Sequence, residues 1–487
     1  MLATAFARMS RNRISVAAVR TRAIAAHMST STDSAAPSQP VLFESDGTAR
    51  TYVLNRERKL NALNGEMISL LRRQLEIWTK SDLCRTIIGT GLGRAFCAGG
   101  DVARVLQHSL QDTTRPAAIE FFKAEFELDY IFSQLPKPYV AILDGITMGG
   151  GAGLAFGAPF RVATERTVFA MPETRIGYCP DVGASYYMSR LDGEVGTYLA
   201  LTSERLVGRE VFEHGLATHY VSSGSVPSLS SHIAEFEAPS FTQINRTIEE
   251  LHAERQSDEP PRKLAGNIRQ ALDFAFRHDS VEEIFGSLKA LSSCPDTHVN
   301  GWAEQTLKTL LDRSPTSLKV ALSAIRRGKN MTLLEALQME LGIATAYCSG
   351  ASTDFSVGIS AVLIDKIEGR PAWSPDKAED VAPEILERFF SEDSEYRSAM
   401  PELSLPDYLQ RRDFDPMVFA LPTETEVLRL IRSSCENGPV ALSGLLSGMD
   451  GLCKRKFGTR EKILDIVHRR CEVVDRQGTP IVSLKED

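Results

Sequence analysis

Apolar residues recur in short runs through the first half of the chain, and polar or glycine-rich stretches separate them. Such runs are typical of buried strands, which we predict at residues 41–44, 51–54, 86–90, 139–143, 161–163 and 167–170. Asp46-Gly47 lies between the first two runs, and an Asp-Gly pair in that position favours a hairpin turn.

Apolar residues at helical spacing lie between these strands. The spacing of Met67, Leu71 and Leu75 predicts a helix, which Asn61 or Asn64 can cap. Further helices are predicted at residues 117–135, 307–325 and 332–347. Strand, turn, strand and helix recur about every forty to fifty residues without a strict sequence repeat. This order favours an α/β fold such as a stacked ββα spiral.

The composition is that of a soluble globular protein. The 487 residues carry a formal net charge of −8, which gives no overall indication of nucleic-acid binding. The eight cysteines include no CxxC pair, so we expect no zinc site, no other bound metal and no disulfide framework. No apolar run is long enough to span a bilayer, and we expect no membrane partner.

The first 32 residues differ from the rest. They contain five arginines, many Ala and Ser residues, and no acidic residue before Asp33. A basic amphipathic segment of this kind is typical of a mitochondrial transit peptide, so we predict a protein of the mitochondrial matrix. A disordered basic tail is the alternative, and the lack of a compact apolar stretch disfavours a secretory signal. Residues 33–40 are predicted to be a linker.

Two glycine-rich turns each follow a predicted strand and precede a predicted helix: AFCAGGD at residues 95–101 and DGITMGGGAG at residues 144–153. Glycine lets the backbone approach a ligand closely, and a helix start leaves N–H groups free. Two such turns side by side would make a two-donor hole for a carbonyl oxygen on which negative charge develops. Alternatively, the glycines only permit tight turns. Neither turn matches a nucleotide-phosphate loop.

Glu173 and Asp181 follow the second turn and lie eight residues apart. Two carboxyl groups near one pocket can divide the work, because burial and mutual repulsion separate their pKa values. One can act on water or as a nucleophile, while the other orients the substrate or moves a proton. The alternatives are a helix N-cap for Asp181 and a surface ion pair with Arg175 for Glu173.

The stretches AFCAGGD, DGITMGGGAGLA and FAMPETRIGYCPDVG resemble the crotonase (enoyl-CoA hydratase/isomerase) superfamily, and within it the 3-hydroxyisobutyryl-CoA hydrolases. The likeness runs from about residue 41 to residue 375. It implies an α/β fold with a crotonase-type ββα spiral core at residues 41–222. A helical region at residues 223–380 would complete the hydrolase domain. Residues 381–487 would be an additional C-terminal extension, on whose role the resemblance is silent.

The resemblance also implies site residues. The backbone N–H groups of Gly100 and Gly150 would form the oxyanion hole. Glu173 would be the catalytic glutamate, and Asp181 would be the catalytic aspartate of the hydrolase branch. Glu125 would contact the substrate together with Gly150, Glu173 and Asp181. Coenzyme A would lie near Arg58, Lys59, Leu63 and Asp101.

The implied activity is hydrolysis of 3-hydroxyisobutyryl-CoA to 3-hydroxyisobutyrate and CoA in valine catabolism. No cofactor is expected, because coenzyme A is part of the substrate. Gly153 stands where hydratases carry a second glutamate, which disfavours enoyl-CoA hydration. Departures from the family pattern at Glu57, Cys179 and Ala184-Ser185 are expected to shift acyl preference or to lower activity.

Members of this branch also resemble a subunit of some mitochondrial ribosomes. The alternative prediction is therefore a non-catalytic or weakly active protein of the small ribosomal subunit. In that case the extension and its basic stretch at residues 454–476 would contact RNA or protein, and only then is nucleic acid an expected partner. The acidic balance of the chain and its intact set of site residues favour the enzyme. The sequence does not indicate an oligomeric state.

Overall fold

The computed structural model describes residues 39–484, apart from residues 261, 408, 410–414, 416, 436–439, 453–455 and 477–478. From Pro40 onward these residues belong to one compact unit. The predicted transit peptide at residues 1–32 and most of the predicted linker at residues 33–40 lie outside the described residues. None of the described helices is long and apolar enough to cross a membrane.

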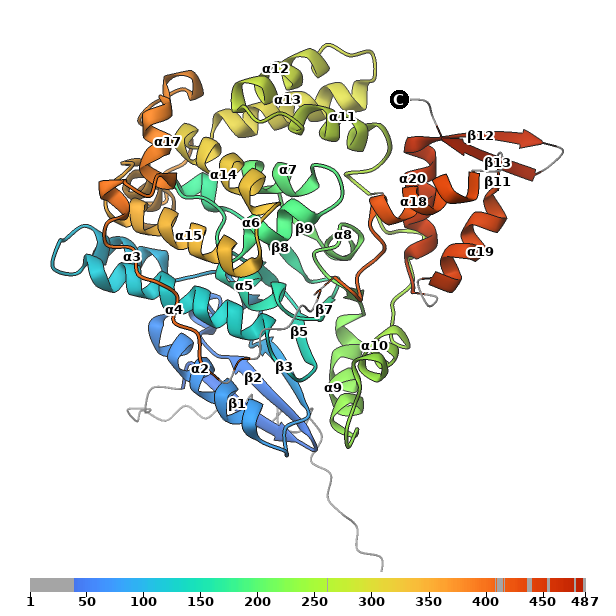
Figure 1. Cartoon of the computed structure of the whole chain (residues 1–487), viewed down its shortest axis with the longest axis horizontal. Helices are drawn as coiled ribbons and strands as arrows, with labels where there is room; N and C mark the ends of the chain where they lie inside the picture. The colour runs from blue at the N-terminus through green and yellow to red at the C-terminus, as the bar shows by residue number, and fades with distance from the viewer. Residues whose placement is uncertain are drawn as a thin grey trace, which may run out of the picture. The chain divides into compact units, whose positions relative to one another are not determined.

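A six-stranded sheet forms one layer of the core, with the strand order β1-β2-β3-β5-β7-β10 (Figure 1). Its strands are β1 (Val41–Asp46), β2 (Ala49–Leu54), β3 (Thr86–Gly91), β5 (Tyr139–Leu143), β7 (Phe160–Ala163) and β10 (His219–Tyr220). β1 and β2 pair antiparallel across the predicted Asp46-Gly47 turn, and the other neighbouring strands are parallel. Every residue of β5 is buried, which explains its uninterrupted apolar run.

A second sheet carries the glycine turns. Its strands, in spatial order, are β4 (Ala95–Cys97), β6 (Ile146–Met148), β8 (Val168–Ala170) and β9 (Leu206–Val207). Along the chain, β3, β5 and β7 of the large sheet lead directly into β4, β6 and β8. The helices that follow are α3 (Val102–Ser109), α5 (Gly150–Phe156) and the short 3₁₀ helix η2 (Glu173–Ile176). The predicted ββα repetition is therefore confirmed.

Two long helices cover the turns and the large sheet. α2 (Gly65–Lys80) is capped by Asn64, whose side chain accepts a hydrogen bond from the Met67 N–H at 2.9 Å. α4 (Arg115–Ser133) is packed between other helices and contacts α2, α3, α5 and α15. Because little of α4 faces solvent, three of its acidic residues are buried: Glu125, Glu127 and Asp129.

The helical region follows. Its helices are α6 (Ala184–Tyr187), α7 (Val195–Thr202), α8 (Arg209–Glu213), α9 (Val226–Ala234), α10 (Phe241–Glu249), α11 (Gly266–Phe276), α12 (Val281–Leu291), α13 (Thr297–Leu311), α14 (Pro315–Gly328), α15 (Leu333–Cys348) and α16 (Asp354–Ile359). The single helix predicted at residues 307–325 is wrong. The chain breaks between α13 and α14, where Ser314 caps a new helix that starts at Pro315. The helix predicted at residues 332–347 is confirmed as α15.

Beyond residue 380 the chain forms a strap and a small module. The strap, which comprises the described parts of residues 391–421, follows α17 (Pro383–Phe390) and lies on the core, where Phe419 stacks on Phe160 with ring centroids 4.8 Å apart. The C-terminal module comprises residues 424–484 and has an apolar core of its own. Its elements are α18 (Glu424–Cys435), β11 (Val440–Ala441), α19 (Leu442–Leu452), α20 (Thr459–Arg470), β12 (Cys471–Arg476) and β13 (Thr479–Leu484) (Figure 1). The sequence predicted only helix and loop here, so the three-stranded sheet was missed.

Candidate active site

Two glycine turns meet at the ends of neighbouring strands. Gly99 and Gly100 follow β4, Gly149 and Gly150 follow β6, and the two strands pair in parallel. A Cβ atom placed on Gly150 would lie 3.4 Å from the Gly100 nitrogen. The Gly150 N–H has no acceptor within its own helix because it starts α5, and the Gly100 N–H donates to none of the described turns and loops. Two adjacent free donors are the arrangement of an oxyanion hole.

Glycine is required in these turns for two reasons. Gly99 has a φ of 110° and Gly149 a φ of 47°, which other residues rarely adopt. A Cβ atom on Gly150 would also lie 2.2 Å from Glu125 Oε1, and one on Gly149 would lie 2.9 Å from Glu173 Oε1. The glycines therefore serve both the turn geometry and the close approach of two carboxyl groups.

Glu173 begins η2 directly after β8 and is buried. Burial, with a smaller contribution from the neighbouring Glu125, raises the pKa of this carboxyl to about 8. Its Oε2 atom has no hydrogen-bond partner. Arg175 is exposed on the same 3₁₀ turn, so the surface ion pair considered for Glu173 is wrong. Glu173 is instead a buried acid beside the hole.

Asp181 lies on the turn that leads into α6, and it is buried as well. Gly183 is the N-cap residue of α6, and the first helical N–H, that of Ala184, binds the main-chain carbonyl of Asp181 at 2.9 Å. An N-cap role for the Asp181 side chain is therefore wrong. Burial raises the pKa of this carboxyl well above its ordinary value, and the nearby Tyr178 offsets only part of that rise.

Glu125 reaches the hole from α4. Its side chain is buried, and burial raises its pKa to about 8. The unpartnered Oε1 atom lies 3.6 Å from a Cβ placed on Gly100, in addition to its close approach to Gly150. The structure thus brings Glu125, Glu173 and the two N–H groups around one point.

Sequence reasoning missed two more acids of this cluster. Asp129 lies one helical turn after Glu125, and neither of its buried oxygens has a hydrogen-bond partner. A Cβ placed on Gly153 would lie 2.7 Å from Asp129 Oδ2, so Asp129 fills the space of a side chain at 153. The spacing i, i+4 on an apolar helix was the available signal. Glu340 on α15 had none, because its partners Gly183 and Ser185 are more than 150 residues away.

These five carboxyl groups influence one another. Burial is the main cause of each raised pKa, and repulsion from the other acids adds to it for Asp129, Glu173 and Asp181. No ion pair of the described residues involves any of the five, so they cannot all be ionised near neutral pH. The site therefore holds carboxylates and neutral acids together, and it can accept and donate protons at one place. No three side chains of the described residues are placed to hold a metal ion.

The residues predicted to bind coenzyme A do not all lie beside the hole. Leu63 is buried beside the hole, where its N–H donates to the first glycine turn at 2.8 Å and its carbonyl accepts from the Asp101 N–H at 2.8 Å. Arg58 and Lys59 are exposed, on a 3₁₀ turn that precedes Leu63. Asp101 does not stand alone, because the guanidinium of Arg56 pairs with its carboxylate at 3.1 Å.

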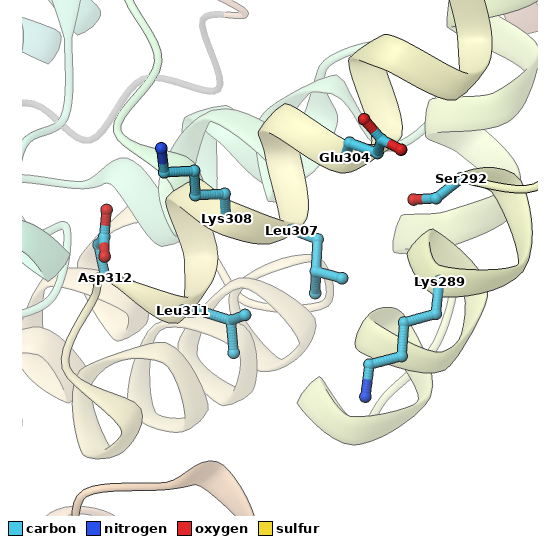
Figure 2. A pocket seen from close by; sticks show the side chains of 7 residues that line it. All are labelled: Lys289, Ser292, Glu304, Leu307, Lys308, Leu311 and Asp312. Atoms are coloured by element: carbon cyan, nitrogen blue, oxygen red, sulfur yellow. The ribbon is translucent and has the colours of Figure 1, made fainter.

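An open groove between α12 and α13 lies elsewhere in the helical region (Figure 2). It has a volume of about 540 Å³. Its lining residues are Lys289, Ser292, Glu304, Leu307, Lys308, Leu311 and Asp312. None of them belongs to the acid cluster or to the glycine turns, so the groove is not part of the candidate active site.

Residues 49–390 match the enoyl-CoA hydratase/isomerase family. The chain belongs to this family. The fold agrees, since the structure resembles a carnitinyl-CoA dehydratase from Mycobacterium thermoresistibile with a TM-score of 0.65 and 30% identity, over 76% of this chain and 99% of that one. An enoyl-CoA hydratase from Rhodobacter sphaeroides matches with a TM-score of 0.62 and 28% identity, over 72% and 97% of the two chains. The predicted crotonase-type core is confirmed.

Relatives of two kinds match this chain. The mitochondrial 3-hydroxyisobutyryl-CoA hydrolase of Gallus gallus is 39% identical over 76% of this chain and 93% of its own length. The human enzyme of the same name is also 39% identical, again over 76% and 93%. The small ribosomal subunit protein mS47 of Neurospora crassa is 38% identical over 92% of this chain and 88% of its own. The resemblance to the hydrolase branch is confirmed, and the protein is mitochondrial as these hydrolases are.

Proposed function

We propose that this family member hydrolyses 3-hydroxyisobutyryl-CoA to 3-hydroxyisobutyrate and CoA in valine catabolism. One observation carries the proposal: the N–H groups of Gly100 and Gly150 lie beside the buried carboxyl of Glu173, with Glu125 and Asp181 in the same acid cluster. Two donors and several carboxyl groups suit acyl transfer from a thioester to water. The relatives that are named 3-hydroxyisobutyryl-CoA hydrolase support this substrate.

The space around Gly153 supports hydrolysis rather than hydration. A side chain at 153 would start 2.7 Å from Asp129 Oδ2 and 2.6 Å from Val182 Cβ. Real Cβ atoms do not approach other atoms so closely, so this chain cannot carry the second glutamate of the hydratases on α5 without rearrangement. A site without that acid lacks the pair of glutamates that adds water across a double bond.

In the proposed reaction, the thioester carbonyl oxygen accepts both N–H groups of the hole. Each such donor typically stabilises the oxyanion by roughly 2.7–4 kcal/mol. Glu173 either attacks the carbonyl carbon, which gives an acyl-enzyme anhydride that water then opens, or takes a proton from the water that attacks. In both routes the C–S bond breaks, and the sulfur leaves with the electron pair as the CoA thiolate.

Asp181 would act on the leaving group and on the substrate hydroxyl, not on the carbonyl. Burial holds its pKa well above the usual range, so its carboxyl can stay neutral near pH 7 and donate a proton. The leaving sulfur would take this proton, and before the reaction the same O–H would donate a hydrogen bond to the substrate hydroxyl. Glu125 would contact the acyl group from α4.

The test is CoA release from (S)-3-hydroxyisobutyryl-CoA by the full chain, followed with a thiol-reactive dye. We expect turnover by the wild type and a loss of at least roughly 10²-fold in Glu173→Ala, because the reacting carboxyl is gone. Arg175→Ala changes an exposed neighbour on the same turn and should keep its rate. A wild type that releases no CoA from this or another short 3-hydroxyacyl thioester would contradict the proposal.

One observation favours a second function, as a protein of the small subunit of the mitochondrial ribosome. The match to the Neurospora crassa ribosomal protein leaves out about 39 of the 487 residues, since it covers 92% of this chain. It therefore includes part of residues 424–487, whereas the hydrolase matches cover only 76%. Sedimentation of the tagged full chain with small ribosomal subunits from mitochondria, stable to a wash at moderate salt, would support this function. Sedimentation as a free protein would contradict it.

A further inference from the structure

The turn that carries Asp181 has an unfavourable backbone. Val182 has a φ of 55° and Gly183 a φ of 85°. Glycine enters this left-handed region easily, but a β-branched residue such as valine does so only when its surroundings impose it. The turn therefore needs contacts that hold it in place.

Glu340 supplies those contacts from α15. Its carboxylate is buried, with 1% of the residue exposed. One oxygen accepts the Gly183 N–H at 2.7 Å, and the other accepts the Ser185 N–H at 2.9 Å and the Ser185 hydroxyl at 2.5 Å. Three donors of one five-residue turn thus converge on a single side chain that lies 155 residues away from Ser185.

The opposite side of the turn packs against the helix of the oxyanion hole. A Cβ placed on Gly153 of α5 would lie 2.6 Å from Val182 Cβ, so the valine already fills the space beside that helix. The turn cannot move toward α5, and Glu340 fixes it on the side of α15. The main chain at Asp181 is thereby set relative to the Gly150 N–H.

We propose that Glu340 is a positioning residue that holds the Asp181 carboxyl at the working distance from the oxyanion hole. The proposal rests on the hydrolase function proposed above and adds a residue to its machinery. Glu340 does not touch the substrate in this scheme, because it acts through the N–H groups of Gly183 and Ser185.

The kinetic test is a double-mutant cycle with the full chain. Glu340→Gln keeps the shape but places an NH₂ group opposite an N–H donor, so the turn should shift. We expect kcat to fall roughly tenfold with little change in KM, since the oxyanion hole and the CoA contacts are intact. The double variant Glu340→Gln/Asp181→Asn should be no slower than Asp181→Asn alone. A double variant in which the two losses of kcat multiply would overturn the proposal.

Two matched variants separate positioning from general stability. Ser185→Ala removes only the hydroxyl bond and leaves both backbone bonds, so it should lose less activity than Glu340→Gln. Glu424→Gln removes another buried carboxylate, in the C-terminal module, and should leave kcat unchanged. An equal loss of kcat in Glu424→Gln would overturn the proposal.

Hydrogen–deuterium exchange provides a readout that does not depend on activity. The peptide that spans residues 181–188 should exchange faster in Glu340→Gln than in the wild type and remain protected in Glu424→Gln. A wild type without thioesterase activity would remove the proposed function, while this exchange would still decide whether Glu340 holds the turn. If Glu340→Gln does not fold, Ser185→Ala carries the same comparison at a smaller amplitude. Unchanged exchange in the turn would overturn the proposal.

Discussion

At the scale of single residues, the buried carboxyl groups of the acid cluster lower the stability of the fold, and the proposed reaction uses them. Asp129 shows this most clearly, because both of its oxygens are buried without a hydrogen-bond partner. An unsatisfied buried carboxyl is expensive for the folded state. It can persist because a neutral acid costs less to bury than a carboxylate, and burial, together with the negative neighbours, raises the pKa of Asp129 well above 3.8.

Replacement of Asp129 by asparagine should flatten the dependence of stability on pH. Because the folded-state pKa is raised, the folded chain binds more protons than the unfolded chain between the two pKa values. The stability that Asp129 contributes is thus present below its unfolded pKa and is lost as the pH rises. Between pH 5 and pH 7 the wild type should lose up to about 3 kcal/mol relative to Asp129→Asn.

Urea unfolding at the two pH values measures this difference. Asp82→Asn is the matched control, because its side chain is 99% exposed, and it should follow the wild type at both pH values. Parallel losses in wild type and Asp129→Asn would show that Asp129 is ionised in the folded state.

A methyl group at Gly150 should damage the proposed oxyanion hole. It would meet Glu125 Oε1 at 2.2 Å and lie 3.4 Å from the Gly100 nitrogen, so the carboxyl must move and the second donor is partly covered. We expect kcat of Gly150→Ala to fall roughly 10²-fold, the usual loss for one impaired donor.

Gly301→Ala is the control for Gly150→Ala. Gly301 lies on α13 with nothing within 4 Å of an added Cβ, so this substitution should keep activity and raise helix stability by up to about 1 kcal/mol. Thiol release and thermal unfolding measure both variants. A Gly150→Ala variant with a rate within twofold of the wild type would exclude its N–H from the hole.

At the scale of elements, local sequence patterns predicted the strands and helices that depend on residues close together in the chain. Short apolar runs marked the strands to within one or two residues, as at β5, because a strand that is buried on both faces has no polar residue to blur its ends. The helix α15 was predicted from its apolar residues at helical spacing, and in the structure a capping box of Thr332 and Glu335 marks its start. The break between α13 and α14 was missed because apolar spacing continues across Pro315.

What the sequence could not show depends on contacts between distant segments. Gly100, Gly150 and Glu173 stood in motifs, and the parallel pairing of β4, β6 and β8 explains why those motifs meet. Glu340 belongs to no motif, and only the packing of α15 against the Asp181 turn reveals it. β11 was missed because it has only two residues, and β12 was missed because charged residues flank its Val473-Val474 pair.

At the scale of the whole described chain, four ion pairs join the C-terminal module to the core, beside a stacked contact between Phe457 and His252. The pairs between module and core are Lys456–Glu249, Lys462–Asp192, Glu424–Arg269 and Arg470–Asp273. Of these residues, Glu424 is the central one, because it also accepts hydrogen bonds from Arg469 and Arg470 within the module. Burial alone would raise its pKa, but the arginines outweigh burial and lower the pKa to about 2.

Loss of the Glu424 charge should therefore loosen the module without touching the chemistry. Glu424→Gln removes one carboxylate partner from the buried Arg269 and Arg469, which keep Asp273 and Asp465, so we expect a cost of about 1–3 kcal/mol. Because the folded-state pKa is lowered, this stabilisation is present above the unfolded pKa of 4.5 and is lost as the pH falls toward 2. The difference in stability between variant and wild type should therefore close in acid.

Limited proteolysis at pH 7 should cut within residues 424–484 of the variant and spare the wild type, while thioester hydrolysis stays equal. Glu472→Gln, on an exposed residue of β12, should resist like the wild type. Equal resistance of all three proteins would mean that the apolar contacts of the strap, and not the ion pairs of Glu424, hold the module in place.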